Sequence, residues 1–185
     1  MTAPGPDPLP PVAFLPTELQ RELRSDHAGE TGAVYLYRGI LAMSKDPSVI
    51  TMATEHLEQE EQHLGFFDAW LTSAQISLFI PVWRLAGWTL GAIAALAGPA
   101  AVYLTIDAVE EFVVEHYGQQ LHRLADQERW QAVSTVLEQF CRDEQNHRND
   151  AIAQAKAQQP SFTASLWRGI VNGGSRIAVS IAKTL

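Results

Sequence analysis

The sequence predicts an all-α protein, a four-helix bundle with two additional apolar or amphipathic helices. Segments of helical length are separated by Pro, Gly and Asp residues in the positions typical of helix ends. No stretch shows the sustained alternation of polar and apolar residues that indicates a half-buried strand. With 185 residues, the chain is long enough for one domain with a substantial hydrophobic core.

The first two helices are marked by their starts. Residues 1–16 hold six of the ten prolines and no basic residue, so we expect a flexible Pro-rich tail that is neither a signal peptide nor a transit peptide. Thr17 and Gln20 form a capping-box pattern at the start of a helix of about 28 residues. Asp46 followed by Pro47 supplies an N-cap and a first-turn proline for a second helix, which we expect to reach about residue 70.

The remaining helices complete a domain that we expect to span 17–185. An apolar helix at about 81–98 ends at a Gly-Pro pair, and Pro99 begins a fourth helix that reaches about residue 124. Asp126 is predicted to cap a fifth helix that ends before the next proline, near residue 158. The segment at about 161–184 is a weaker candidate for an amphipathic, basic helix.

The overall charge excludes several classes of function. The chain has 13 Lys and Arg against 21 Asp and Glu, a net charge of -8. An acidic protein repels phosphate backbones, so we expect no nucleic-acid partner. Its single cysteine excludes a disulfide framework and any zinc or iron–sulfur site built from cysteines.

The apolar residues are concentrated in one segment. The composition is 46% hydrophobic and 18% charged, and Arg84 is the only charged residue between Asp68 and Asp107. The uncharged run 85–106 is long enough to span a membrane. Glycines and a Gly-Pro pair interrupt it, and it continues directly into acidic residues, so we expect a packed or interfacial helix and not a membrane span.

Four of the predicted helices carry a constellation of metal-ligand residues. Two helices each carry a Glu-x-x-His motif, whose residues lie on one face because they are three apart. The other two helices each contribute a glutamate, and the order alternates along the chain. The six residues are Glu30, Glu60, His63, Glu110, Glu144 and His147. This order matches the metal site of ferritin-like carboxylate bundles.

The charge of these residues supports a two-metal site. Four carboxylates and two neutral imidazoles carry a charge of -4, which two divalent cations would balance. Oxygen ligands with one imidazole per metal suit iron or manganese better than zinc. His56, four residues before Glu60, is an alternative ligand on the second helix, and His122 is expected at the surface. Neighbouring glutamates are expected to form a solvated face: Glu55, Glu58 and Glu61.

These motifs resemble a known family. The segment from Leu23 to Ala33 is similar to the first metal helix of the demethoxyubiquinone hydroxylases, the ferritin-like di-iron monooxygenases of ubiquinone biosynthesis. The resemblance runs from about residue 18 to the C-terminus. Four later segments resemble further motifs of the family: Glu60–Leu64, Pro81–Ala92, Val109–Tyr117 and Arg142–His147.

The resemblance implies an enzyme. It implies a centre of two Fe(II) ions, held by the six residues above, that uses O2 to hydroxylate the ring of a polyprenylated methoxy-benzoquinone or quinol, converting demethoxyubiquinone to demethylubiquinone. It also implies NADH or another electron donor, although the sequence has no Gly-rich nucleotide motif. His116 and Tyr117 fall on residues adjacent to the centre. By position, Asp107 and Asp143 are candidates to hydrogen-bond the ligands.

The expected partners follow from the substrate. We expect the polyprenyl benzoquinone itself and a membrane lipid surface, with other ubiquinone-biosynthesis proteins or a second copy of the chain as further candidates. Candidate substrate or membrane contacts are Trp83, Leu85, Trp88, Leu90 and Ile93. Glu115 replaces a histidine common in relatives, which we interpret as a tuning difference. The absence of a mitochondrial targeting segment favours a peripheral protein on the cytoplasmic side of a bacterial inner membrane.

Two other classes of function stay open from the sequence. One is a ferritin-like protein that handles iron or reduces peroxide. The other is a lipid-binding protein whose metal site is structural. Neither class requires quinone hydroxylation, so an assay for that reaction separates them from the enzyme.

Overall fold

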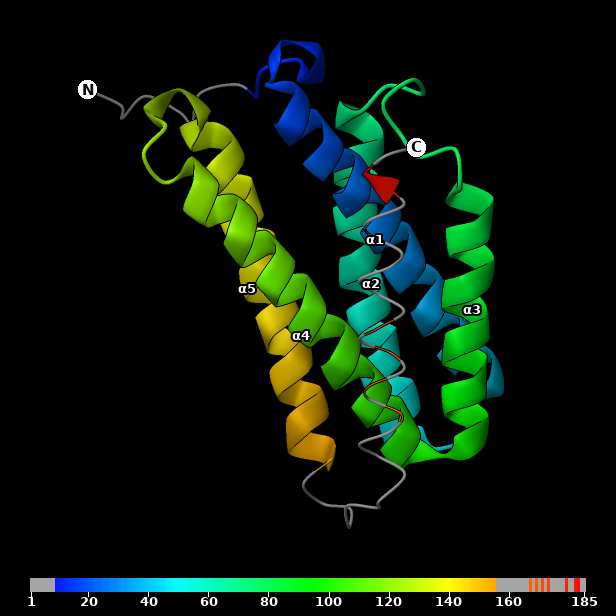
Figure 1. Cartoon of the computed structure of the whole chain (residues 1–185). Helices are drawn as coiled ribbons and strands as arrows, with labels where there is room; N and C mark the ends of the chain where they lie inside the picture. Colours follow the sequence, from blue (N-terminus) through cyan, green and yellow to red (C-terminus); the bar gives the residue numbers. More distant parts are fainter. Residues whose placement is uncertain are drawn as a thin grey trace, which may run out of the picture.

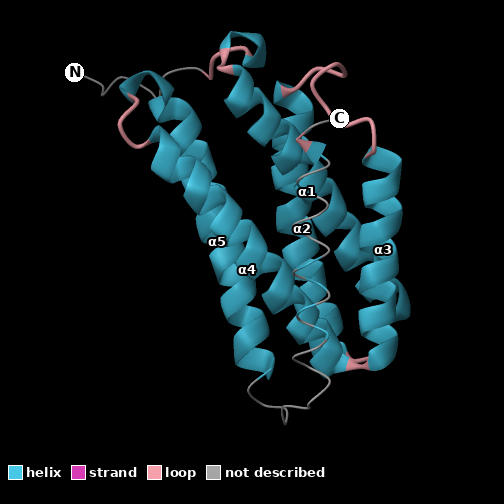
Figure 2. Cartoon of the chain, viewed as in Figure 1, coloured by secondary structure: helices cyan, strands magenta, loops and turns pink. Residues whose placement is uncertain are grey.

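The protein is helical throughout the part that the structure, a computed structural model, describes. It describes residues 9–155 and seven positions further on: Trp167, Gly169, Val171, Gly173, Val179, Ala182 and Lys183. Within these residues there are five α-helices, two short 3-10 helices and no strand, which confirms the all-α prediction (Figure 2). The elements are η1 (Val12–Phe14), α1 (Thr17–Met43), α2 (Pro47–Trp70), α3 (Ile80–Ala97), α4 (Pro99–Leu124), η2 (Glu128–Trp130) and α5 (Gln131–Ala155).

Two helix starts have the predicted chemistry. The side chain of Asp46 accepts hydrogen bonds from the backbone N–H groups of Ser48 and Val49, with Pro47 in the first turn of α2. Gly98 separates α3 from α4 with a φ of 103°, a backbone conformation that residues with a Cβ rarely adopt. A single glycine can therefore end one helix and begin the next.

Two predicted caps are wrong. Thr17 is the first residue of α1 and does not cap it, since the N-cap position is Pro16. The Gln20 side chain donates instead to the carbonyl of Leu15, at 2.8 Å. Asp126 lies in a turn, and α5 begins only after η2. The 3-10 turn brings Trp130 into the hydrophobic core, and this burial decides where the chain re-enters a helix.

The helices form two pairs and a flanking element. α1 packs against α2, α4 packs against α5, and α3 lies along α1 (Figure 1). One hydrophobic cluster occupies the end of the bundle that includes Leu23, Phe67 and Leu137. A second occupies the other end, around Ile40 and Ile106. On each of the four bundle helices the predicted metal-ligand residues fall between these two clusters, so the polar site lies midway along the bundle.

Glycines allow α3 to approach α1 closely. A Cβ on Gly91 would overlap the backbone carbonyl of Leu36, and a Cβ on Gly87 would overlap that of Gly32. The opposite face of α3 stays exposed. Within the described residues α3 is the one helix long and apolar enough to cross a membrane, and only 22% of that stretch is buried. Length and composition of a single helix are weak evidence for a span.

The ends of the chain are described only in part. Residues 1–8, half of the predicted Pro-rich tail, lie outside the described residues. From residue 9 onward the chain contacts the bundle, because Val12 and Leu15 are buried and the Trp70 indole donates to the carbonyl of Pro10. Most of the predicted helix at about 161–184 also lies outside the described residues. Of the seven positions that are described in this segment, six are helical.

Candidate metal centre

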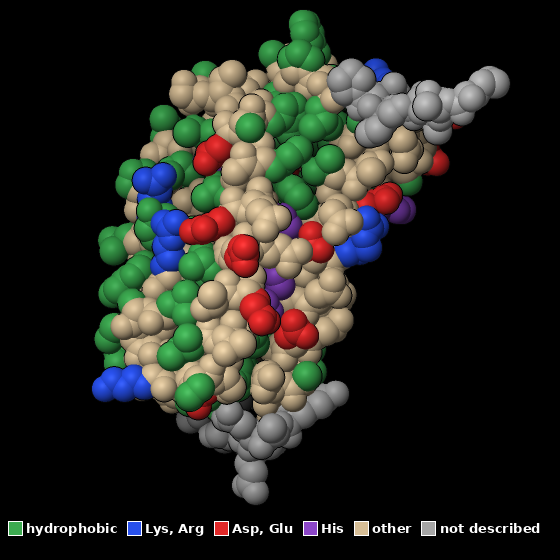
Figure 3. Space-filling model, turned by 180° about the vertical axis from the view of Figure 1, so that it is seen from behind, with side chains coloured by type: hydrophobic (Ala, Val, Ile, Leu, Met, Phe, Trp, Pro, Cys, Tyr) green, Lys and Arg blue, Asp and Glu red, His purple; other side chains and the backbone are tan. Residues whose placement is uncertain are grey.

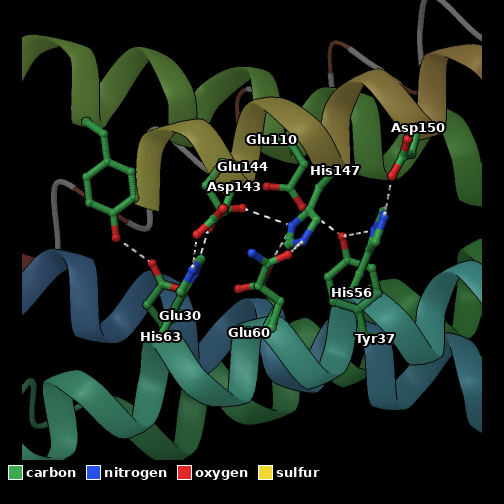
Figure 4. A network of polar contacts seen from close by, with 12 residues as sticks. Glu30, Tyr37, His56, Glu60, His63, Glu110, Asp143, Glu144, His147 and Asp150 are labelled. Carbon is green, nitrogen blue, oxygen red and sulfur yellow. Dashed lines mark hydrogen bonds and ion pairs between the residues drawn. The ribbon is translucent and has the colours of Figure 1, made fainter. Parts of the chain in front are cut away.

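The structure brings all six predicted ligand residues together. They come from four helices, project into the bundle (Figure 4) and are each at most 3% exposed. The members are Glu30 on α1, Glu60 and His63 on α2, Glu110 on α4, and Glu144 and His147 on α5. We call these residues the acidic cluster. Figure 3 shows histidine side chains in the middle of the back face of the molecule, bordered by acidic ones.

The acidic cluster divides into two overlapping groups, each able to hold a metal ion. In each group one ligand atom per residue lies within 4.8 Å of the others. The first group contains Glu30 and His63, the second contains Glu110 and His147, and both contain Glu60 and Glu144. Two carboxylates are therefore placed between two neighbouring positions, an arrangement that suits a pair of cations.

Glu144 accepts hydrogen bonds from both histidines of the acidic cluster. Its carboxylate oxygens lie 3.0 Å from His63 Nδ1 and 3.3 Å from His147 Nδ1. Burial raises the pKa of Glu144, but the hydrogen bonds to both imidazoles outweigh it and lower the pKa to about 2. Burial likewise lowers the pKa of His63, yet hydrogen bonds to Glu144 and Glu30 raise it to about 12. Without metal, an ionised carboxylate and a protonated imidazole thus stabilise each other.

Glu60 and Glu110 are in the opposite situation. Burial, together with the neighbouring carboxylates, raises the pKa of both groups well above its ordinary value. Neither oxygen of Glu60 accepts a hydrogen bond, although Oε1 lies 3.1 Å from His147 Nδ1, and one oxygen of Glu110 has no hydrogen-bond partner. Buried acceptors without partners are costly, and cations bound among them would supply the missing interactions. The donor set therefore fits a two-metal centre.

Other side chains support this cluster. The Tyr117 hydroxyl donates to Glu30 Oε1 at 2.5 Å. Asp143, one of the two predicted supports, lies 3.2 Å from His63 Nε2. Gln59 Oε1 lies 3.0 Å from His147 Nε2. A partner on the far nitrogen fixes the orientation of an imidazole ring, as is common around metal-bound histidines.

The other predicted residues lie further out. Asp107 accepts a hydrogen bond from Arg148, at 3.0 Å. His116 lies 2.8 Å from a carboxylate oxygen of Asp26. Glu115, where relatives often have histidine, is exposed and pairs with Gln119. The glutamates predicted to form a solvated face are all exposed, which confirms that prediction: Glu55, Glu58 and Glu61.

The alternative ligand His56 belongs to neither metal group. Its ring stacks on that of His147 with 4.1 Å between centroids, and burial together with His147 lowers its pKa to about 4. His56 contacts Tyr37 and Asp150, two residues that were not among the predicted site residues. Both follow a cluster residue by one or two helical turns, since Tyr37 is seven residues after Glu30 and Asp150 three after His147. That spacing is the one signal that could have found them.

An apolar cavity of about 440 Å³ adjoins the acidic cluster. It lies between α1, α3 and α4, closed in part by Val171, Val179 and Ala182, and it reaches Glu30, Glu60, Glu110 and Glu144. Among the predicted substrate or membrane contacts, Trp83 and Leu90 line this cavity. The other three are exposed on α3: Leu85, Trp88 and Ile93.

Fold and site together define a class. A helical bundle with a buried, paired carboxylate–histidine site midway along its axis is a ferritin-like bundle of the di-iron type. Residues 17–182 match the family described as ubiquinone biosynthesis protein COQ7, and the chain belongs to this family. The predicted resemblance is confirmed.

Three relatives are named as hydroxylases of demethoxyubiquinol or demethoxyubiquinone. The 3-demethoxyubiquinol 3-hydroxylase of Rhodospirillum rubrum is 35% identical over 168 residues, 89% of this chain and 77% of that protein. The mitochondrial NADPH-dependent 3-demethoxyubiquinone 3-hydroxylase of Rattus norvegicus is 29% identical over 165 residues, 87% and 75% of the two chains. The mitochondrial 5-demethoxyubiquinone hydroxylase of Saccharomyces cerevisiae is 30% identical over 151 residues, 72% and 65% of the two chains.

Proposed function

We propose that the chain is a monooxygenase that hydroxylates the ring of a polyprenylated methoxy-benzoquinone or quinol, converting demethoxyubiquinone to demethylubiquinone with O2. One observation carries this proposal: a largely apolar cavity reaches four carboxylates of the buried acidic cluster. A ring with an isoprenoid tail needs such a cavity, whereas a protein that stores iron does not. The names of the R. rubrum and rat relatives support the same reaction.

We assign the six residues of the acidic cluster as ligands of two iron ions. Glu60 and Glu144 would be shared, while Glu30 and His63 complete one ligand set and the remaining two residues complete the other. Iron suits an oxygen-rich set with one imidazole per metal. Bound iron supplies the O2 chemistry, in which one oxygen atom enters the ring and the other leaves as water.

The residues around the centre have tasks of their own. Tyr117 holds one carboxylate oxygen of Glu30 by its hydroxyl and lines the cavity together with His116. Asp143 orients the His63 ring. The apolar wall, which includes Trp83 and Leu90, keeps water away from the reacting ring. These roles place substrate and ligands in a fixed geometry, which is the main contribution a protein makes to cofactor chemistry.

We propose that a nicotinamide nucleotide supplies the electrons. The name of the rat relative specifies NADPH, and the resemblance of the sequence implies NADH or a comparable donor. The chain carries no Gly-rich fingerprint for a tightly bound dinucleotide. A brief encounter with the reduced nucleotide is consistent with both facts.

We further propose peripheral attachment to the cytoplasmic side of a bacterial inner membrane. α3 exposes Leu85, Ile93 and Leu96 by 47% to 68%, while its other face packs on α1. Apolar side chains at the surface of an amphipathic helix enter the interface of a bilayer, and the substrate resides there. In a liposome flotation assay, Leu85→Asp should reduce binding and Glu58→Gln should not. Equal flotation of the variant and the wild type would refute this attachment.

The activity is tested with purified protein loaded anaerobically with Fe(II). Given a short-tail demethoxyquinol, O2 and NADH, the wild type should form the ring-hydroxylated product, detected by mass spectrometry. Glu144→Ala should abolish product, because it removes a residue common to both metal groups. A protein that oxidises iron or consumes peroxide but leaves the quinol unchanged would instead be an iron-handling or peroxide-reducing relative.

A further inference from the structure

A row of hydrogen-bonding side chains connects the acidic cluster to the surface. Glu110 Oε1 lies 2.9 Å from the Tyr37 hydroxyl, which lies 3.2 Å from His56 Nδ1. The other nitrogen of this ring, Nε2, lies 3.4 Å from Asp150 Oδ2. Asp150 is 64% exposed, whereas the His56 side chain is 4% exposed. Figure 4 shows Tyr37, His56 and Asp150 close together at one end of the acidic cluster.

This row is separate from the apolar cavity. None of Tyr37, His56 and Asp150 lines the cavity, although Glu110 does. Glu110 therefore stands where two routes meet, one apolar and one polar. The first suits a substrate with a hydrocarbon tail. The second offers a continuous row of polar side chains within 2.9 to 3.4 Å of one another, from the buried cluster to the surface.

The hydrogen bonds in the row have a common direction. The Tyr37 hydroxyl has one proton and donates it to Glu110 Oε1, so it can only accept from His56. His56 Nδ1 must then carry a proton, and in the neutral imidazole Nε2 can accept the next one when the Asp150 carboxyl, 3.4 Å away, is protonated. The two donors, the Tyr37 hydroxyl and His56 Nδ1, therefore both point toward Glu110. The acceptor that can take up a new proton, His56 Nε2, lies at the end of the row nearest the surface.

The proposed reaction requires such a route. Insertion of one oxygen atom of O2 into a ring C–H bond and release of the other as water consumes two electrons and two protons. The electrons come from the reduced nucleotide proposed above. The protons must reach a centre whose residues are at most 3% exposed, and an apolar cavity does not conduct them.

We propose that Asp150, His56 and Tyr37 form a proton relay from solvent to Glu110. This inference rests on the proposed function. Asp150 collects a proton from water and passes it to His56 Nε2, while the Nδ1 proton moves to the Tyr37 oxygen and the hydroxyl proton moves to Glu110 Oε1. Every N–H or O–H bond broken is matched by one formed. The ring and the hydroxyl then return to their starting orientation, and no charge stays in the row.

The test compares relay variants with matched variants of exposed or half-buried residues outside the row. The relay variants are His56→Ala, Tyr37→Phe and Asp150→Asn. The control variants are His122→Ala, Tyr35→Phe and Asp126→Asn. The first readout needs no enzymatic activity. Metal-free protein is mixed with Mn²⁺ in weakly buffered solution containing a pH indicator, because metal binding expels protons from its ligands, and these protons can leave along the same row.

In this experiment His56→Ala should bind as much Mn²⁺ as the wild type and release as many protons, about tenfold more slowly or worse. Millimolar imidazole should restore the rate, because it can occupy the space of the missing ring. Tyr37→Phe should be equally slow and should not respond to imidazole. Asp150→Asn should lose less, since water reaches this end of the row directly, and the control variants should release protons as the wild type does.

Hydroxylation supplies the second readout. The rate with His56→Ala should fall and show a larger solvent deuterium isotope effect, and imidazole should reverse both changes. A purely structural role for His56 predicts no rescue. Proton release at the wild-type rate in His56→Ala and Tyr37→Phe would overturn the relay, as would slow release in His56→Ala that imidazole leaves unchanged. If His56→Ala does not bind Mn²⁺, Tyr37→Phe alone decides, since it lacks only one hydroxyl. If the wild type fails to hydroxylate, the proposed function is wrong, and the Mn²⁺ experiment still decides the relay.

Discussion

Two glutamates shared by both metal groups should respond in opposite ways to the same substitution in metal-free protein. Glu60 is fully buried and accepts no hydrogen bond, and burial together with the carboxylates of Glu144 and Glu30 raises its pKa although Oε1 lies 3.1 Å from His147 Nδ1. Removing the ionisable carboxyl by Glu60→Gln should stabilise the metal-free fold by about 1–3 kcal/mol, because burying a charged group costs more than burying a neutral amide of the same shape. Glu144 hydrogen-bonds two histidines. Glu144→Gln should destabilise it by about 3–5 kcal/mol, since it leaves buried imidazolium groups without their counter-charge.

Thermal unfolding in the presence of a chelator measures both effects. For a domain of this size about 1 kcal/mol corresponds to roughly 2–4 °C, so Tm should rise by about 2–12 °C for Glu60→Gln and fall by about 6–20 °C for Glu144→Gln. Glu61→Gln, an exposed glutamate paired with Arg38, is the matched control and should change stability by about 1 kcal/mol or less. Both cluster variants should also bind metal more weakly, because each residue belongs to both metal groups.

The pH dependence gives the sign of the Glu60 effect independently. A carboxyl group whose pKa is higher in the folded state destabilises the fold increasingly as pH rises above its unfolded value, near 4.5. The gain from Glu60→Gln should therefore grow from about pH 5 toward pH 8 and vanish below 4.5, where both states are protonated. A Glu60→Gln protein that melts below the wild type at pH 8 without metal would refute this electrostatic reasoning.

Three further outcomes are expected. Gly91→Ala should lower Tm, because its Cβ would overlap the Leu36 carbonyl, whereas Gly65→Ala, which meets open space, should leave Tm unchanged or raise it; equal effects would contradict the close packing of α3. Metal affinity, measured by titration between pH 6 and 8, should increase with pH, because Glu60 and Glu110 have raised pKa values and must lose protons to bind. Fe(II) or Mn²⁺ at about 100 times its Kd should stabilise the fold by roughly 2.7 kcal/mol, and a chelator should remove this gain.

Helix boundaries could be predicted where the local sequence decides them. Asp46 caps α2 and Gly98 separates α3 from α4 because a side-chain acceptor and a positive φ act within one turn. The start of α5 could not be predicted from Asp126, since an aspartate favours a turn as readily as a cap. Burial of Trp130, a contact with distant residues, decided it.

The acidic cluster could be predicted because a glutamate followed by a Glu-x-x-His motif occurs twice along the chain, on four successive bundle helices. Its internal order could not be predicted. His56 and His63 are seven residues apart and face the same side of α2, so spacing does not distinguish them. The structure places His63 beside Glu144 and His56 beside Tyr37. The contacts of Tyr37 cross between helices, and no local pattern encodes them.

The most direct measurement follows the oxygen atom. Fe(II)-loaded protein is given a short-tail demethoxyquinol, a reduced nicotinamide nucleotide and isotopically labelled O2, and the product is analysed by mass spectrometry. If the chain is an O2-dependent hydroxylase, the wild type should form a ring-hydroxylated product that carries one labelled oxygen atom. Glu144→Ala should form no such product. Unchanged quinol, or product whose new oxygen comes from water, would contradict the assignment of this site.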